Sequence, residues 1–168
     1  MRILIAGVGN VLRGDDGFGI EALHLLQRGI NIEGIEFFES GIAGISLVQR
    51  LMDGFDSLII VDALDRGGAP GQVYVLEPDI DSLGKESDLG DAIDLHQADP
   101  EGVLRLAAAL RVLPQHVWIV GCQAVGCDDL GVPLSKPVAK ALPAVVEQVQ
   151  KIARNLLANR TADVARGS

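Results

Sequence analysis

The stretch ILIAGVGNVLRGDDGFG, residues 3–19, decides the fold and places a candidate site at the end of the first strand. The apolar run Arg2–Val8 is typical of a buried strand. A Gly-x-Gly-Asn turn ends it, and two adjacent carboxylates, Asp15 and Asp16, stand just ahead of a predicted helix. Because ligands of open α/β sheets bind at the carboxyl ends of the strands, this turn is a candidate binding site.

Strand and helix patterns alternate through the first part of the chain. We expect strands at residues 2–8, 32–38 and 57–62, with helices at residues 16–27 and 44–52 between them. This alternation predicts a parallel sheet that helices cover on both faces. The Gly- and Pro-rich connector at residues 63–71 is too short for a crossover helix, so the strand at residues 72–77 is expected to run antiparallel to its predecessor.

The remainder of the chain predicts a loop, two helices and a last strand. We expect a polar, acidic loop at residues 78–94, a helix at 100–110, a strand at 116–122 and a long helix at 135–159. Ser135 is the expected N-cap of the long helix, and Pro143 is expected to kink it or to divide it from a first turn. Residues 160–168 are expected to fray. We find no repeat or linker, so residues 1–168 are taken as one domain.

Charge and composition exclude several classes of function. The net charge is −9, from 23 acidic residues against 14 Lys and Arg, and no basic cluster stands out, which argues against binding to nucleic acid. No apolar run approaches the roughly 20 residues of a membrane span. The first residues do not resemble a secretory signal, so we expect a cytoplasmic protein. The two cysteines, Cys122 and Cys127, are too few for a disulfide framework.

Three residues at strand ends or in loops could carry chemistry, namely Asp16, Asp62 and His96. The first and third strands of a doubly wound sheet are usually neighbours, and the crevice at their carboxyl ends would hold both carboxylates. An imidazole from the loop after the fourth strand would complete a site of two carboxylates and one histidine. Such a donor set suits Ni, Zn, Cu or Fe and leaves coordination positions open.

Simpler explanations exist for most of these residues. Helix capping explains Asp15 and Asp16 equally well, because Asp is a preferred N-cap and complements the helix dipole. Asp62 favours a functional role, since a carboxylate directly after the apolar run LIIV is costly to bury without a partner. His96 alone could be a surface or capping residue. The glycine turn is not a dinucleotide fingerprint, because Leu12 stands where the third glycine would be.

Five segments in order resemble one family, the [NiFe]-hydrogenase maturation endopeptidases. Besides residues 3–19, they are ESGIAG at 39–44, LIIVDALDRGGAPGQVYVLEP at 58–78, DLHQADPEGVLRLAAAL at 94–110 and IVGCQAVGCDDLGVPLSKPVAKALPAVVEQV at 119–149. Two positions depart from the family pattern. Ile42 stands where Thr is common, and Gln123-Ala124 replaces an acidic or polar residue followed by Pro.

The resemblance implies a cytoplasmic protease that removes a short C-terminal extension from a hydrogenase large-subunit precursor already loaded with nickel. It places the metal-contacting positions at Asp16, Asp62 and His96, and it leaves Asp15 as the expected helix cap. It implies that the protease holds no permanent metal and that the nickel of the substrate is recognised. The implied fold is a three-layer α/β/α sandwich around a five-stranded, mostly parallel twisted sheet, with the fourth strand antiparallel at an edge.

The resulting hypothesis is that nickel polarises the scissile carbonyl or a water while a carboxylate handles protons. Whether an Asp acts as general base or only as ligand stays open. We expect close approach of the substrate tail to backbone at five positions: Gly7, Gly9, Asn10, Gly41 and Gly44. Two alternatives are a nickel-sensing chaperone that does not cut and a hydrolase like the peptidyl-tRNA hydrolases, although the net charge of −9 disfavours the latter.

Overall fold

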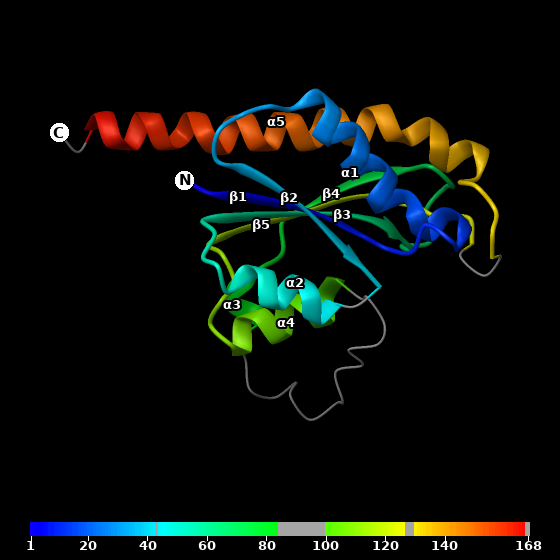
Figure 1. The fold of residues 1–168 in the computed structure, drawn as a ribbon, viewed down its shortest axis with the longest axis horizontal. Coiled ribbons are helices and arrows are strands. Elements are labelled where there is room, and N and C mark those ends of the chain that lie inside the picture. Colours follow the sequence, from blue (N-terminus) through cyan, green and yellow to red (C-terminus); the bar gives the residue numbers. More distant parts are fainter. Residues whose placement is uncertain (43, 84–99, 127–129, 167–168) are drawn as a thin grey trace.

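A central five-stranded sheet organises the molecule (Figure 1). The computed structural model describes residues 1–42, 44–83, 100–126 and 130–166. The strand order is β2-β1-β3-β5-β4. The strands are β1 (Ile3–Val8), β2 (Ile35–Gly41), β3 (Ser57–Leu64), β4 (Val73–Leu76) and β5 (His116–Gln123). All neighbouring pairs are parallel except β4 and β5, so the expected antiparallel edge strand is confirmed.

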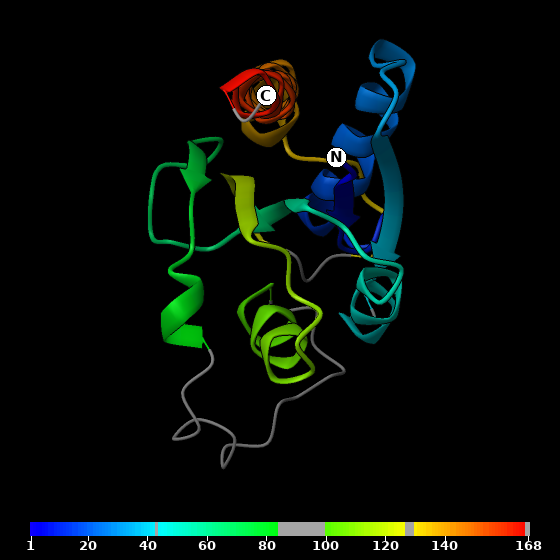
Figure 2. The same cartoon turned by 90° about the vertical axis from the view of Figure 1, so that its left-hand side faces the viewer.

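Helices cover both faces of this sheet, which confirms the expected α/β/α layering (Figures 1 and 2). One face carries α1 (Phe18–Gly29) and α5 (Lys136–Arg166). The other carries α2 (Gly44–Leu51), α3 (Ile80–Leu83) and α4 (Pro100–Ala109). The chain after β1 therefore leaves toward one face, while the chain after β3 leads to helices on the other. This divergence between adjacent strands creates the crevice that the sequence predicts.

The strands supply side chains to both cores because successive residues of a strand point to opposite faces. In β1, Ile3 and Ile5 pack with α1 and α5, whereas Leu4 and Ala6 pack with α2 and α4. All four side chains are fully buried. The apolar run near the N-terminus is thus the shared wall of two cores, which explains why it has no polar alternation.

Helix α1 packs against the sheet backbone to backbone. A Cβ atom on Gly19 would lie 2.2 Å from the carbonyl oxygen of Val61 and 2.3 Å from that of Val8. A Cβ atom on Gly7 would lie 2.7 Å from the carbonyl oxygen of Gly19. Only glycines permit this approach, and it brings the start of α1 close to the carboxyl ends of β1 and β3.

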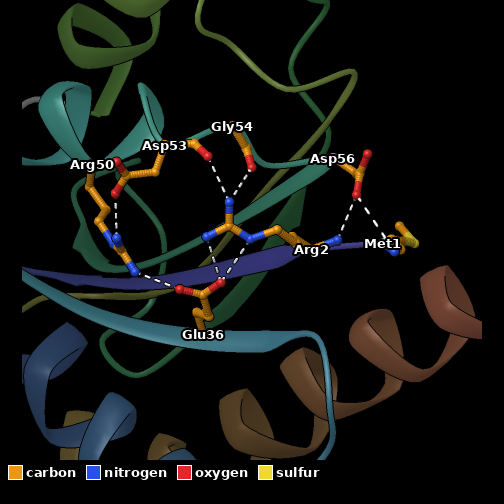
Figure 3. Close-up of polar contacts among 7 residues, drawn as sticks. All are labelled: Met1, Arg2, Glu36, Arg50, Asp53, Gly54 and Asp56. Atoms are coloured by element: carbon orange, nitrogen blue, oxygen red, sulfur yellow. Dashed lines mark hydrogen bonds and ion pairs between the residues drawn. The ribbon is translucent and has the colours of Figure 1, made fainter.

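A charged cluster joins the opposite, amino ends of the strands (Figure 3). The Arg2 guanidinium donates to one oxygen of Glu36 at 2.8 and 3.0 Å, and Arg50 donates to the other oxygen. Arg2 also donates to the backbone carbonyl of Asp53 at 2.6 Å, just ahead of β3. The Phe55 ring lies under both guanidiniums, 4.4 Å from Arg2 and 5.3 Å from Arg50. The starts of β1, β2 and β3 are therefore tied together by charge.

Several element boundaries differ from the sequence expectations. The first helix does not begin at Asp16, because residues Gly14–Gly17 form a 3-10 turn, η1, ahead of α1. The expected loop at residues 78–94 contains the short helix α3 in its described part. Helix α5 includes Pro143 and continues to Arg166, past the end we expected at residue 159. Fraying of the tail stays a prediction.

Candidate active site

Asp16 and Asp62 line one cavity of about 640 Å³ at the carboxyl edge of the sheet. Asp16 comes from η1, after β1, and Asp62 from the adjacent strand β3. The cavity's other walls are the connector after β3, the end of β4, α3 and the start of α4. The structure thus brings together the two carboxylates that the strand pattern placed at one crevice.

Asp16 is a half-buried carboxylate held by the glycine turn. The backbone N–H of Asn10 donates to Asp16 Oδ2 at 3.0 Å and to the Asp16 carbonyl oxygen at 3.2 Å. Desolvation raises the pKa of Asp16, while the Asn10 amide and the charge of Arg13 oppose this rise. Gly9 has a φ of 121°, and a Cβ there would lie 1.8 Å from the Asp16 carbonyl oxygen. Gly9 is therefore required to seat Asp16 in this position.

Asp62 is almost fully buried, with 4 % of its surface exposed. Its Oδ1 accepts a hydrogen bond from the backbone N–H of Ala63 at 2.8 Å. The strand continues to Leu64, two residues beyond the expected end at Asp62. In β5 the paired residue is Gly121, where a Cβ would lie 2.5 Å from the Asp62 carbonyl oxygen. The carboxylate is thus fixed by regular sheet structure rather than by a loop.

Asp15 is not the cap of the first helix, which corrects the sequence expectation. Its carboxylate accepts hydrogen bonds from the backbone N–H groups of Val125 at 2.9 Å and Ser135 at 2.6 Å, and from the Ser135 hydroxyl at 2.9 Å. The side chain is buried, and η1 has no side-chain cap. The Ser135 hydroxyl thus donates to Asp15. Asp15 therefore ties the chain after β1 to the segments that follow β5.

His96 lies outside the described residues. The described residues on either side of its segment, Leu83 and Pro100, both line the cavity with Asp16 and Asp62. In the described ranges, no three His, Cys, Asp or Glu side chains form a group able to hold a metal ion.

The other two histidines lie elsewhere. His24 pairs with Glu39 at 2.7 Å on the surface, and His116 lines a different cavity at the start of β5. Neither belongs to the cavity that Asp16 and Asp62 line.

The five positions expected to approach the substrate have different surroundings. Gly7 packs against α1, and a Cβ on Gly44 would lie 2.3 Å from a methyl of Val103. Asn10 Oδ1 accepts from the backbone N–H of Leu12 at 3.0 Å, which closes the turn. Gly41 has a φ of 60° and open space where a Cβ would stand. Gly9 lines the cavity itself. Internal packing thus accounts for Gly7 and Gly44, and approach of a substrate stays a prediction.

Gln123 is a residue of the site region whose structural role the sequence did not reveal. It is buried at the end of β5, and its Oε1 accepts from the backbone N–H groups of Arg66 at 2.8 Å and Gly68 at 3.1 Å. Its Nε2 donates to Asp65 Oδ1 at 3.0 Å. These bonds hold the turn that carries Asp65 and Arg66 at the cavity. The signal was a single amide at the end of an apolar run.

The cavity is strongly acidic. Among the described lining residues one side chain is cationic, Arg66, which lies 5.8 Å above the Tyr74 ring. The acidic lining residues are Asp16, Asp62, Asp65, Glu77, Asp79 and Glu101. Hydrogen bonds from Gln123 and the Gly67 amide lower the pKa of Asp65, which keeps it ionised. Such a cavity favours a cation or a basic segment and offers a carboxylate as proton acceptor.

Comparisons with known proteins agree with this architecture. A model of the hydrogenase maturation protease family (HycI) matches residues 20–152. The chain belongs to this family. It is 32% identical over 155 residues to the hydrogenase expression/formation protein HupD of Rhizobium leguminosarum, covering 92% of this chain and 75% of the relative. It is 32% identical to a putative hydrogenase maturation protease of Methanocaldococcus jannaschii, covering 86% and 92%.

Solved structures of maturation peptidases share the fold. The hydrogenase maturating endopeptidase HybD of Escherichia coli superposes with a TM-score of 0.72 at 27% identity, covering 92% of this chain and 93% of that one. A hydrogenase 2 maturation peptidase from a Thaumarchaeota archaeon gives 0.70 at 31% identity, covering 91% and 98%. This hydrogenase maturation protease is therefore a processing endopeptidase, and the family assignment decides against the chaperone and peptidyl-tRNA hydrolase alternatives. In its described part, no helix is long and apolar enough to span a membrane.

Proposed function

We propose that this hydrogenase maturation protease removes the C-terminal extension of a nickel-loaded [NiFe]-hydrogenase large-subunit precursor and uses Asp16, Asp62 and His96 to contact the substrate nickel. The observation that carries the proposal is the convergence of Asp16 and Asp62, from neighbouring strand ends, on one acidic cavity. Nickel belongs to the substrate in this proposal, and the protease holds no metal of its own. It acts in the cytoplasm, with neither nucleic acid nor membrane as a partner.

The donor set supports nickel as the recognised group. Two carboxylate oxygens and one imidazole leave coordination positions that the substrate's own ligands fill. His96 stands four positions before Pro100 in the sequence, and Pro100 lines the cavity. The acidic lining attracts a metal cation and repels an acidic protein segment. A precursor without nickel would therefore present the same peptide but lack the group that these residues contact.

The two carboxylates have different surroundings, which supports different roles. Asp62 is buried and fixed by the Ala63 amide, which suits a ligand of constant geometry. Asp16 is more accessible, and burial raises its pKa toward the range in which a carboxylate accepts and returns a proton. We assign both carboxylates to metal contact and give Asp16 the additional role of proton transfer during peptide hydrolysis. The substrate tail passes Gly9, Asn10 and Gly41, with Gly7 and Gly44 supporting that path from within.

The test is cleavage of nickel-loaded and nickel-free precursor, read by mass spectrometry of the large subunit. We expect only the nickel-loaded form to shorten. Asp16→Asn, Asp62→Asn and His96→Ala should each lower the rate at least about 100-fold. His24→Ala, a histidine outside the cavity, is the matched control and should leave the rate unchanged. Equal cleavage of both precursor forms would refute nickel recognition, and wild-type rates for the three cavity variants would refute the site.

A further inference from the structure

Exposed apolar side chains gather at the end of the sheet that also carries the active-site cavity. Six large apolar side chains in the described ranges are more than half exposed. Five of them, between 51 % and 74 % exposed, form what we call the apolar rim: Val11, Leu12, Ile42, Val125 and Leu130. Exposed apolar residues scattered singly are ordinary on protein surfaces, but five gathered at one end of a sheet are not.

The rim is continuous because its segments are hydrogen-bonded to the chain between β1 and α1. The Leu12 carbonyl accepts from the Gly131 N–H at 2.8 Å, next to Leu130. The Val125 N–H donates to the Asp15 carboxylate, and the Gly9 N–H donates to the carbonyl of Gly41, next to Ile42. Figure 1 shows the connection after β1, the turn after β2 and the segment leading into α5 at the same end of the sheet.

The same connection also carries Asp16, which lines the cavity. Residues 9–16 thus include both Asp16 of the cavity and Val11 and Leu12 of the rim, so a protein whose scissile bond lies at Asp16 lies next to the rim. A cavity of about 640 Å³ takes only the short segment around the cut, so the bulk of a folded substrate lies outside it, on the surface around the mouth. Val11 also lines a second hollow of about 270 Å³ together with Val132, so this surface is contoured. The buried centre of a protein interface is typically apolar, as are the five exposed side chains of the rim.

We propose that the apolar rim is the docking surface for the folded body of the large-subunit precursor, with an apolar patch of that partner seated on Leu12 and Leu130. This inference rests on the proposed function and adds a second recognition element to the acidic cavity. The cavity binds the nickel and the segment around the scissile bond, and the rim binds the rest of the precursor.

The test compares the double variant Leu12→Asp/Leu130→Asp with Met52→Asp. Met52 is the sixth highly exposed apolar residue, 62 % exposed just after α2, and it lies outside the rim. With nickel-loaded precursor, the double variant should raise KM at least tenfold and change kcat less than threefold, whereas Met52→Asp should match the wild type. In an Asp62→Asn background that does not cut, the double variant should also fail to co-elute with precursor on gel filtration.

A wild-type KM and intact co-elution for the double variant would overturn docking at the rim while leaving the proposed function standing. Failure of the proposed function has a different signature, which is wild-type cleavage by Asp16→Asn and Asp62→Asn. A wild-type protein that is dimeric by light scattering, with a double variant that is monomeric and keeps its KM, would assign the rim to a second copy of this chain and overturn the proposal.

Discussion

Replacing Asp15 should destabilise this protease far more than replacing its neighbour Asp16. Asp15 is buried and accepts three hydrogen bonds from Val125 and Ser135, two of them from backbone N–H groups. Asp15→Ala leaves those two N–H groups without their acceptor. The loss therefore includes the cost of leaving two partly buried backbone donors without an acceptor.

The structure sets the size of the effect. A hydrogen bond to a charged group contributes about 1.5–3 kcal/mol, and an unsatisfied buried donor costs about 1–3 kcal/mol. Because one side chain makes all three bonds and these costs do not add, we expect Asp15→Ala to lower the free energy of unfolding by about 3–5 kcal/mol. Asp15→Asn keeps one acceptor oxygen and should cost about 1–3 kcal/mol. Ser135→Ala removes only a hydroxyl and should cost about 1 kcal/mol.

The assay is urea unfolding at pH 7, followed by circular dichroism, for these three variants and for Asp16→Asn as the control. The expected order of destabilisation is Asp15→Ala, then Asp15→Asn, then Ser135→Ala. The double variant Asp15→Ala/Ser135→Ala should lose less than the sum of the single variants, because the two share a bond. An Asp15→Ala protein that loses no more than Ser135→Ala would refute the idea that Asp15 ties these segments together.

Three further predictions concern the cavity. Burial raises the pKa of Asp16 above its usual 3.8, so the stability that this shift contributes is full below that pH and is lost as pH rises through the folded-state pKa. Asp16→Asn should therefore gain more stability over wild type at pH 7 than at pH 3.5, measured by urea unfolding. Gly9→Ala should lower the free energy of unfolding by at least about 2 kcal/mol and remove most cleavage activity. Gly54 has a φ of 77° and open space where a Cβ would stand, so Gly54→Ala should lower the free energy of unfolding by only about 1 kcal/mol. Gln123→Ala should lower the free energy of unfolding by about 1–3 kcal/mol and slow precursor cleavage, because the turn at Arg66 loses its hydrogen bonds. An unchanged cleavage rate would show that this turn does not serve the site.

The layers and the adjacency of β1 and β3 could be predicted because they depend on local patterns. The apolar run of β1 and the connector after β3, which is too short for a helix, were enough to indicate parallel strands and one antiparallel strand, and the family resemblance placed that strand at an edge. The meeting of Asp16 and Asp62 followed from the same topology, since adjacent parallel strands end at the same edge of the sheet. His96 was a candidate from its place in the loop after the fourth strand and from the family resemblance, and it lies outside the described residues.

The roles of Asp15 and Gln123 could not be predicted because their partners are distant in sequence. Asp15 bonds to residues 110 and 120 positions away, whereas the local pattern of a carboxylate before a helix indicated a cap. Gln123 bonds to Arg66, which lies 57 positions away, and a lone amide at the end of an apolar run does not indicate which partner it binds. A short-range pattern reports which element a residue belongs to, but not which remote backbone groups it satisfies.

The charged cluster around Arg2 has a consequence for the distant end of the sheet. Strand side chains alternate between faces, so a slip of β3 by one residue would turn Asp62 away from α4 and toward the core under α1. Arg2 holds the chain just before β3 through the carbonyls of Asp53 and Gly54, while Glu36 holds Arg2 to β2. At about 3.3 Å per residue, the strand starts lie some 17 Å from the ends that carry the carboxylates. The ion pairs at the strand starts thus fix the register of β3, and this register determines the face of the sheet on which Asp62 lies.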